Sequence, residues 1–125
     1  MNEHDLKFRT KSFSLRILKL IDSPPETRSG RILAAQLGRS GTSVGANYRA
    51  ACRSRSRAEM ISKISVVEEE ADESAFWMEL LVEHGLAHGA KVAALQQEAG
   101  ELTAIMVASR RTLARNQKSR IESPK

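Results

Sequence analysis

Aromatic residues and cysteines are scarce in this chain, and each shortage excludes a class of structure. Only 4% of the 125 residues are aromatic, and the apolar content comes mainly from leucine, isoleucine, valine and alanine. This composition favours helices packed on helices over a β-sandwich. Cys52 is the only cysteine, which excludes an internal disulfide and disfavours a metal site built from paired cysteines.

Long apolar runs are missing as well. No segment reaches the roughly 20 apolar residues that a membrane-spanning helix needs, and the N-terminus lacks the apolar core of a signal peptide. We therefore expect a cytoplasmic protein with no membrane partner. Strand-like alternation is also missing, which leaves all-α as the expected fold class.

Four amphipathic segments are present instead. Within each, apolar residues recur at three- and four-residue steps, as on the buried face of a helix. The segments are residues 5–21, a second that starts between 24 and 30 and ends near 53–56, a third over 57–84, and a fourth over 90–113. Short links between them predict an antiparallel up-down-up-down four-helix bundle. We expect residues 1–115 to form this domain and residues 116–125 to be a frayed basic tail.

Local signals mark several helix ends. Ser23 to Glu26 and Ser56 to Glu59 both match a capping box, in which a serine and a glutamate satisfy the first free N–H groups of a helix. Gly85, followed by Leu86, fits the left-handed residue that commonly ends a helix.

The second segment contains three glycines that oppose helix formation. Each costs a helix interior about 1 kcal/mol relative to alanine, so tight packing must offset them. Together with two serines they form a nearly bare face that another backbone can approach closely. The packing residues predicted here are Gly38, Gly41, Gly45, Ser40 and Ser43. If this face lies between subunits, substituting leucine for Gly41 or Gly45 should break an oligomer before it unfolds the monomer.

Charge is divided between the segments, although the chain as a whole has a formal net charge of +5. Arginine dominates residues 23–57, and acids dominate residues 58–84. Antiparallel neighbours would bring Arg39 near the middle of the acidic segment, which predicts a structural ion pair. The residues assigned to it are Arg39, Glu69, Glu70 and Glu73.

Two other basic groups have fewer acids nearby, and they are candidates for an anionic partner. One ends the second segment, the other ends the fourth, and the two should approach each other in an antiparallel bundle. The candidate nucleic-acid contacts are Arg49, Arg53, Arg55, Arg57, Arg110, Arg111, Arg115 and Lys118. Binding through phosphate contacts would be largely independent of sequence and weakened by salt.

None of the enzyme motifs considered is complete in this sequence. Residues 41–45 match G-x-S-x-G, but that motif needs a preceding strand, and this segment is helical in period. No phosphate-binding loop of the P-loop type is present, and no glutamate has a histidine three residues later, as a di-metal bundle requires. Tyr48 and Trp77 could stack on bases, yet both lie on or beside a buried stripe, so core or subunit packing is the better interpretation. We expect no enzyme, no cofactor and no metal.

One pattern resembles a known family. Gln36-Leu37-x-Arg39-Ser40-x-x-Ser43-x-x-Ala46-Asn47, followed by basic and serine residues, a glutamate-rich helix and Trp77, resembles the bacterial four helix bundle proteins. These are also called 23S ribosomal RNA intervening-sequence proteins, and the resemblance covers about residues 6–113. Within this pattern Asn47, like the two serines, is structural. The family has no established catalytic residues.

The resemblance implies a homopentamer with a central pore. A related branch, the accessory variability proteins of diversity-generating retroelements, consists of basic pentamers that bind nucleic acid and partner a reverse transcriptase. The leading hypothesis is therefore a non-enzymatic oligomer that binds RNA or DNA through a basic surface. The alternative is an oligomeric scaffold for a protein partner, such as a reverse transcriptase, without direct nucleic-acid contact.

Overall fold

Helices account for nearly all of the described chain. The computed structural model describes residues 1–23 and 25–122, with side chains up to residue 116. The helices are α1 (Glu3–Ile21), α2 (Arg28–Cys52), α3 (Arg57–Glu83) and α4 (Gly89–Glu122). No strand occurs among the described residues. The prediction of an all-α chain with four helices is confirmed.

The helix ends follow local chemistry. Ser56 caps α3, its hydroxyl accepting from the backbone N–H of Glu59 at 3.1 Å, as expected. Gly85 ends the same helix with a φ of +77°. The N–H of Leu86 donates to the Leu81 carbonyl at 2.8 Å, which satisfies one of the last free carbonyls. The start of α2 is set by Thr27, whose hydroxyl accepts from the N–H of Gly30, a cap that the sequence interpretation missed.

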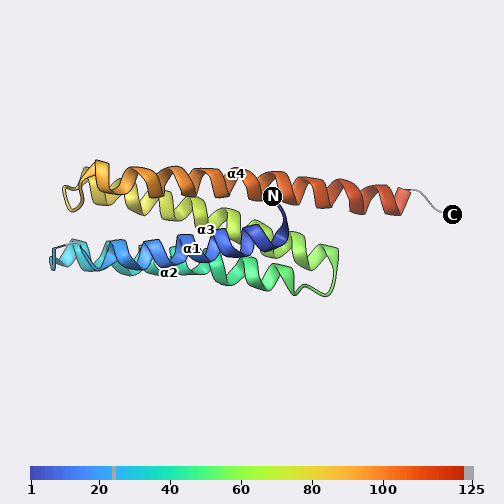
Figure 1. Ribbon diagram of the computed structural model, residues 1–125, viewed down its shortest axis with the longest axis horizontal. Helices are drawn as coiled ribbons and strands as arrows, with labels where there is room; N and C mark the ends of the chain where they lie inside the picture. The colour runs from blue at the N-terminus through green and yellow to red at the C-terminus, as the bar shows by residue number, and fades with distance from the viewer. Residues whose placement is uncertain (24, 123–125) are drawn as a thin grey trace.

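Successive helices pack side by side and alternate in direction. The α1–α2 and α3–α4 links lie at one end of the molecule, and the α2–α3 link lies at the other, which we call the α2–α3 end (Figure 1). Each helix packs along its neighbour in sequence, and α1 and α4 touch more sparsely; among the described residues, α2 makes no contact with α4. Helix α4 is the longest, and its C-terminal part extends past the α2–α3 link (Figure 1).

The core is made by the apolar stripes of the helices. Its largest fully buried side chains include Phe13, Ile17, Leu37, Met78 and Leu102. These residues fall on the three- and four-residue spacing seen in the sequence, because that spacing keeps side chains on one helix face. Burying each such side chain contributes roughly 1.5–3 kcal/mol, which outweighs the helix-breaking tendency of the glycines in α2.

The glycine face of α2 packs against α1 of the same chain. A Cβ on Gly41 would lie 2.5 Å from Cγ2 of Ile17, and one on Gly45 would lie 2.8 Å from Oγ of Ser14. Gly38 faces Ile21 in the same way, at 3.0 Å. The partner that needs bare backbone is therefore α1 and not another subunit. We expected substitutions of Gly41 or Gly45 to break an oligomer before they unfold the monomer. This expectation is corrected, because a side chain at either position would clash with α1 of the same chain.

Helix α4 continues through the boundary expected at residue 115. It is helical to Glu122. The last three positions of the expected tail, 123–125, lie outside the described residues. The division of the chain at residue 115 stays a prediction.

Candidate functional site

Cationic side chains gather around two hollows at the α2–α3 end. Both hollows are lined by Ala46 and Arg49 of α2 and by Arg53, the residue that caps its C-terminus, so they lie on either side of one ridge at the end of that helix. We call the hollow toward α3 the junction hollow and the one toward α1 the α1–α2 groove. Together the two hollows form a surface rich in cations, which we call the basic surface.

The junction hollow has a volume of about 470 Å³. Besides the shared ridge it is lined by Arg55 from the link and by Glu59 and Lys63 from the first turns of α3. Three of the predicted nucleic-acid contacts thus come together here, because the last turn of α2 and the first turns of α3 meet at this link. Cations in the last turn of a helix are also favoured by its dipole.

The α1–α2 groove has a volume of about 560 Å³. Its α1 wall is formed by residues spaced three and four apart, and its α2 wall by Arg49, Arg53 and small residues. The α1 residues are His4, Lys7, Phe8, Lys11 and Ser14; the small α2 residues are Thr42, Gly45 and Ala46. Sequence reasoning missed the α1 cations. Their signal was present as a stripe of basic residues opposite the apolar face of that helix.

The cations of this surface keep their charge uncompensated. Across the two hollows they are Lys7, Lys11, Arg49, Arg53, Arg55 and Lys63, and the linings hold one carboxylate, that of Glu59. Among the described residues, the charged group of none of these six cations lies within 4 Å of a carboxylate oxygen, and Glu59 accepts only from the backbone N–H of Arg55, at 3.3 Å. The ion pairs of the molecule involve other arginines. The surface is therefore available to an anionic partner.

Arg39 lies away from this surface and is paired. Its guanidinium contacts Glu73 and lies 2.9 Å from a carboxylate oxygen of Glu70, both on α3. The hydrogen bond to Glu73 is the main cause that raises the pKa of Arg39. Trp77 donates its indole N–H to the same Glu73 at 3.1 Å. Glu69, the fourth residue assigned to this cluster, is exposed and forms no ion pair among the described residues.

The basic end of α4 differs from expectation. Nε of Arg110 lies 2.6 Å from a carboxylate oxygen of Glu68 on α3, so this arginine is engaged within the chain. Arg111 and Arg115 are exposed. The side chain of Lys118 lies outside the described ones. Neither hollow contains an α4 residue, so the hollows do not join the two basic groups into one patch.

The remaining predicted residues, apart from Arg57, serve packing. The hydroxyl oxygens of Ser40 and Ser74 lie 2.9 Å apart in the α2–α3 core. Asn47 donates from its amide nitrogen to the hydroxyl of Ser43 at 2.7 Å. Arg57 begins α3 and lines neither hollow. Ser43 therefore sits in a continuous helix and is bonded to a neighbour on it, which does not produce the exposed nucleophile of a strand-turn-helix motif.

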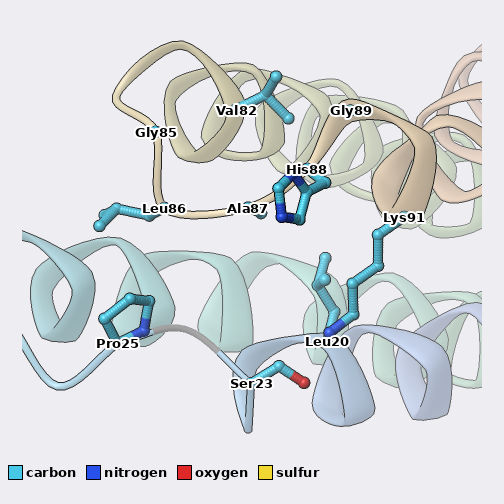
Figure 2. Close-up of a pocket in the computed structure, with 10 residues that line it drawn as sticks. All are labelled: Leu20, Ser23, Pro25, Val82, Gly85, Leu86, Ala87, His88, Gly89 and Lys91. Carbon is cyan, nitrogen blue, oxygen red and sulfur yellow. The ribbon is translucent and has the colours of Figure 1, made fainter.

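A third hollow, of about 620 Å³, lies at the opposite end of the bundle. Its lining is mostly apolar, and Figure 2 shows Lys91 reaching from α4 toward Leu20 on α1, with His88 beside it. The lining includes Ser23 and His88, but no hydrogen bond joins them among the described residues, and no carboxylate or thiol lines the hollow to complete a catalytic group. Across the described chain, no three potential metal ligands gather. None of the described helices combines the length and apolarity of a membrane crossing.

These features define an all-α protein with a cationic surface at one end of a helical bundle. The sequence matches the 23S rRNA-intervening sequence proteins over residues 3–108, and the chain belongs to that family. Its fold is similar to the crystal structure of a protein of unknown function from the S23 ribosomal protein family of Bacteroides thetaiotaomicron. That likeness has a TM-score of 0.82 and 27% sequence identity, and it covers 89% of this chain and 99% of the other. No curated protein matches the sequence.

Proposed function

We propose that this protein is a non-enzymatic, oligomeric, cytoplasmic nucleic-acid-binding module that holds RNA or DNA through phosphate contacts. The observation that carries the proposal is the basic surface around Arg49 and Arg53, with its six cations free of carboxylate partners among the described residues. A surface of this kind attracts a polyanion, and releasing condensed counterions supplies most of the binding free energy.

The chemistry of the side chains supports phosphate as the ligand group. Arginine presents a planar fork of N–H donors that matches phosphate oxygens, and three of the six cations are arginines. Phosphate contacts fix position but carry no sequence information, so binding should tolerate many sequences. Arg57, Arg111 and Arg115 would extend the contact area from the same end of the bundle, whereas Arg110 is left out because Glu68 holds it.

Assembly would strengthen such binding. The family resemblance suggests an up-down-up-down bundle that forms a homopentamer, and five copies of the basic surface would engage one strand with the avidity of linked sites. A scaffold for a protein partner would need surfaces free for that partner, and the glycine face and the charge complementarity between α2 and α3 are the candidates for such surfaces. Both are used within the chain, by α1 and by the Arg39 pairs, so nucleic-acid binding is the better supported function.

Fluorescence anisotropy across a salt series tests this proposal. The ligands are a labelled single-stranded RNA, its DNA counterpart and duplexes of equal length. Affinity should fall linearly on a log–log plot against salt, with a slope of about −0.7 to −0.9 for each phosphate neutralised. The variant Arg49→Glu/Arg53→Glu should lose most of the affinity and flatten the slope.

A matched control lies on the same helix. Arg28→Glu/Arg31→Glu changes the net charge equally, but both residues are exposed at the opposite end of α2, and this variant should keep most of the affinity. Light scattering on the wild type gives the number of subunits. Flat titrations at low salt for every ligand would overturn the proposal and leave the scaffold function.

A further inference from the structure

Phe8 lies in the α1–α2 groove with its ring in solvent. It lines the groove together with Lys7 and Lys11 of α1 and with Arg49 and Arg53 across the gap on α2. Its relative exposure is 74%, the highest of the aromatic residues with large exposed side chains. An apolar ring surrounded by four cations and left uncovered serves no packing purpose in the monomer.

The helix period explains this placement. Phe8 is on the opposite face of α1 from the buried residues Phe13 and Ile17, which line the core. The same groove is lined by the small residues Ser14, Thr42 and Gly45 and has a volume of about 560 Å³. Small residues beside the ring leave space for a planar group.

We propose that the α1–α2 groove binds single-stranded nucleic acid, with one base stacked on Phe8 and the backbone phosphates held by the cations on both sides. This inference rests on the proposed function and adds the class of ligand. Cationic grooves interleaved with aromatic side chains bind single strands, because every base has a π-face to stack and the phosphates need only positive charge.

The groove discriminates against duplexes. Bases in a duplex are stacked on each other and paired, so none is free to lie on Phe8 unless the helix opens. The α1 wall from His4 to Ser14 is about 15 Å long at 1.5 Å per residue, which suits a short stretch of extended strand. Duplexes can still contact the outer arginines through phosphates, but stacking on Phe8 adds nothing to their binding free energy.

Anisotropy titrations of Phe8 variants test the inference. Phe8→Ala should weaken binding of a single-stranded RNA by about 5-fold to 150-fold, the range expected for one base–aromatic stack, and should change duplex binding by less than about 2-fold. The salt slope should stay the same, since Phe8 carries no charge. The control is Phe76→Ala, which removes an exposed ring on α3, outside the groove, and should leave single-strand binding unchanged.

A second variant reports the contact directly. Phe8→Trp, studied with Trp77→Phe so that one tryptophan remains, should show emission quenched by single strands and not by duplexes. If Phe8→Ala leaves single-strand affinity unchanged while Arg49→Glu/Arg53→Glu abolishes it, the groove inference is overturned and phosphate binding stands. If no nucleic acid binds at low salt, both fail. If Phe8→Ala lowers the subunit number measured by light scattering, a second copy of the chain covers the ring, and the inference is likewise overturned.

Discussion

The Ser14 hydroxyl donates a hydrogen bond to the carbonyl oxygen of Gly41 at 2.7 Å, joining α1 to α2. The hydroxyl oxygen of Ser14 also accepts a hydrogen bond from the backbone N–H of Gly45 at 3.1 Å. The side chain fits here because position 45 is glycine, where a Cβ would lie 2.8 Å from the Ser14 oxygen. The contact fixes the register of α1 on α2, and with it the position of Lys11 and Phe8 over the groove.

Replacing this hydroxyl should loosen the α1–α2 contact. Ser14→Ala should lower the free energy of unfolding by about 1 kcal/mol, since both partly buried hydrogen bonds of Ser14 to α2 are lost, while the Gly45 N–H and the Gly41 carbonyl can still bond to each other within the helix. Chemical denaturation followed by circular dichroism measures the change. Ser12→Ala on the same helix removes a hydroxyl that forms no hydrogen bond among the described residues, and it should not destabilise the protein. Equal effects for the two variants would contradict the assignment.

Gly41 should tolerate no side chain, although alanine is the better helix former. Gly41→Ala places a Cβ 2.5 Å from Cγ2 of Ile17, and such overpacking costs roughly 1–3 kcal/mol, more than the helix propensity gained. Thermal unfolding should show a lower Tm. Gly100→Ala is the control: it meets open space on α4 and should raise stability by about 0.5–1 kcal/mol.

The number of subunits tests whether the glycine face of α2 packs on α1 of the same chain or lies between subunits. Ile17 of the same chain covers Gly41, so light scattering at a temperature where Gly41→Ala is still folded should give the wild-type mass. A smaller particle with an unchanged Tm would mean instead that the glycine face lies between subunits.

These glycines show where sequence reasoning succeeds and where it stops. Their spacing indicates that a backbone comes close, because no other feature offsets their cost to the helix. It does not name the partner, since that depends on how the bundle closes. The caps at Ser56 and Gly85 were predictable because their chemistry involves residues only three to five positions apart.

The basic surface was predicted in part for the same reason. Arg49, Arg53 and Arg55 are close in sequence, so a run of arginines revealed them. Lys7 and Lys11 join them only through the packing of α1 on α2, which periodicity does not specify. The pairing of Arg110 with Glu68 could not be predicted either. Many acids on α3 are equivalent in sequence, and only the way α4 packs against α3 selects one of them.

Arg9 should stabilise the packing of α1 against α4, because it forms ion pairs with two glutamates of α4. Its guanidinium lies 2.6 Å and 2.9 Å from carboxylate oxygens of Glu98 and Glu101, across the sparsest contact of the bundle. Arg9→Ala leaves Glu98, whose side chain is 15% exposed, without its partner, which should cost about 1–3 kcal/mol. Hydrogen exchange should show faster opening of α1. The control, Arg16→Ala on the same helix, removes an exposed arginine that forms no ion pair among the described residues, and it should leave the opening of α1 unchanged.

Cys52 should react slowly with alkylating agents near neutral pH. Burial, and then the neighbouring Glu3 carboxylate, raise the pKa of its thiol, while Tyr48 and Lys7 act in the opposite direction. The folded state disfavours the thiolate, so the thiol contributes to the free energy of unfolding. This contribution is fully present below the pKa of the unfolded thiol, about 8.5, and it is lost as pH rises through the higher pKa of the folded state. Iodoacetamide trapping of the native protein should therefore be slower at pH 8.5 than trapping of the denatured chain. Glu3→Gln should accelerate it in the native protein, and Glu69→Gln on α3 should not. A native rate equal to the denatured one, or unchanged by Glu3→Gln, would show that neither burial nor the carboxylate controls this thiol.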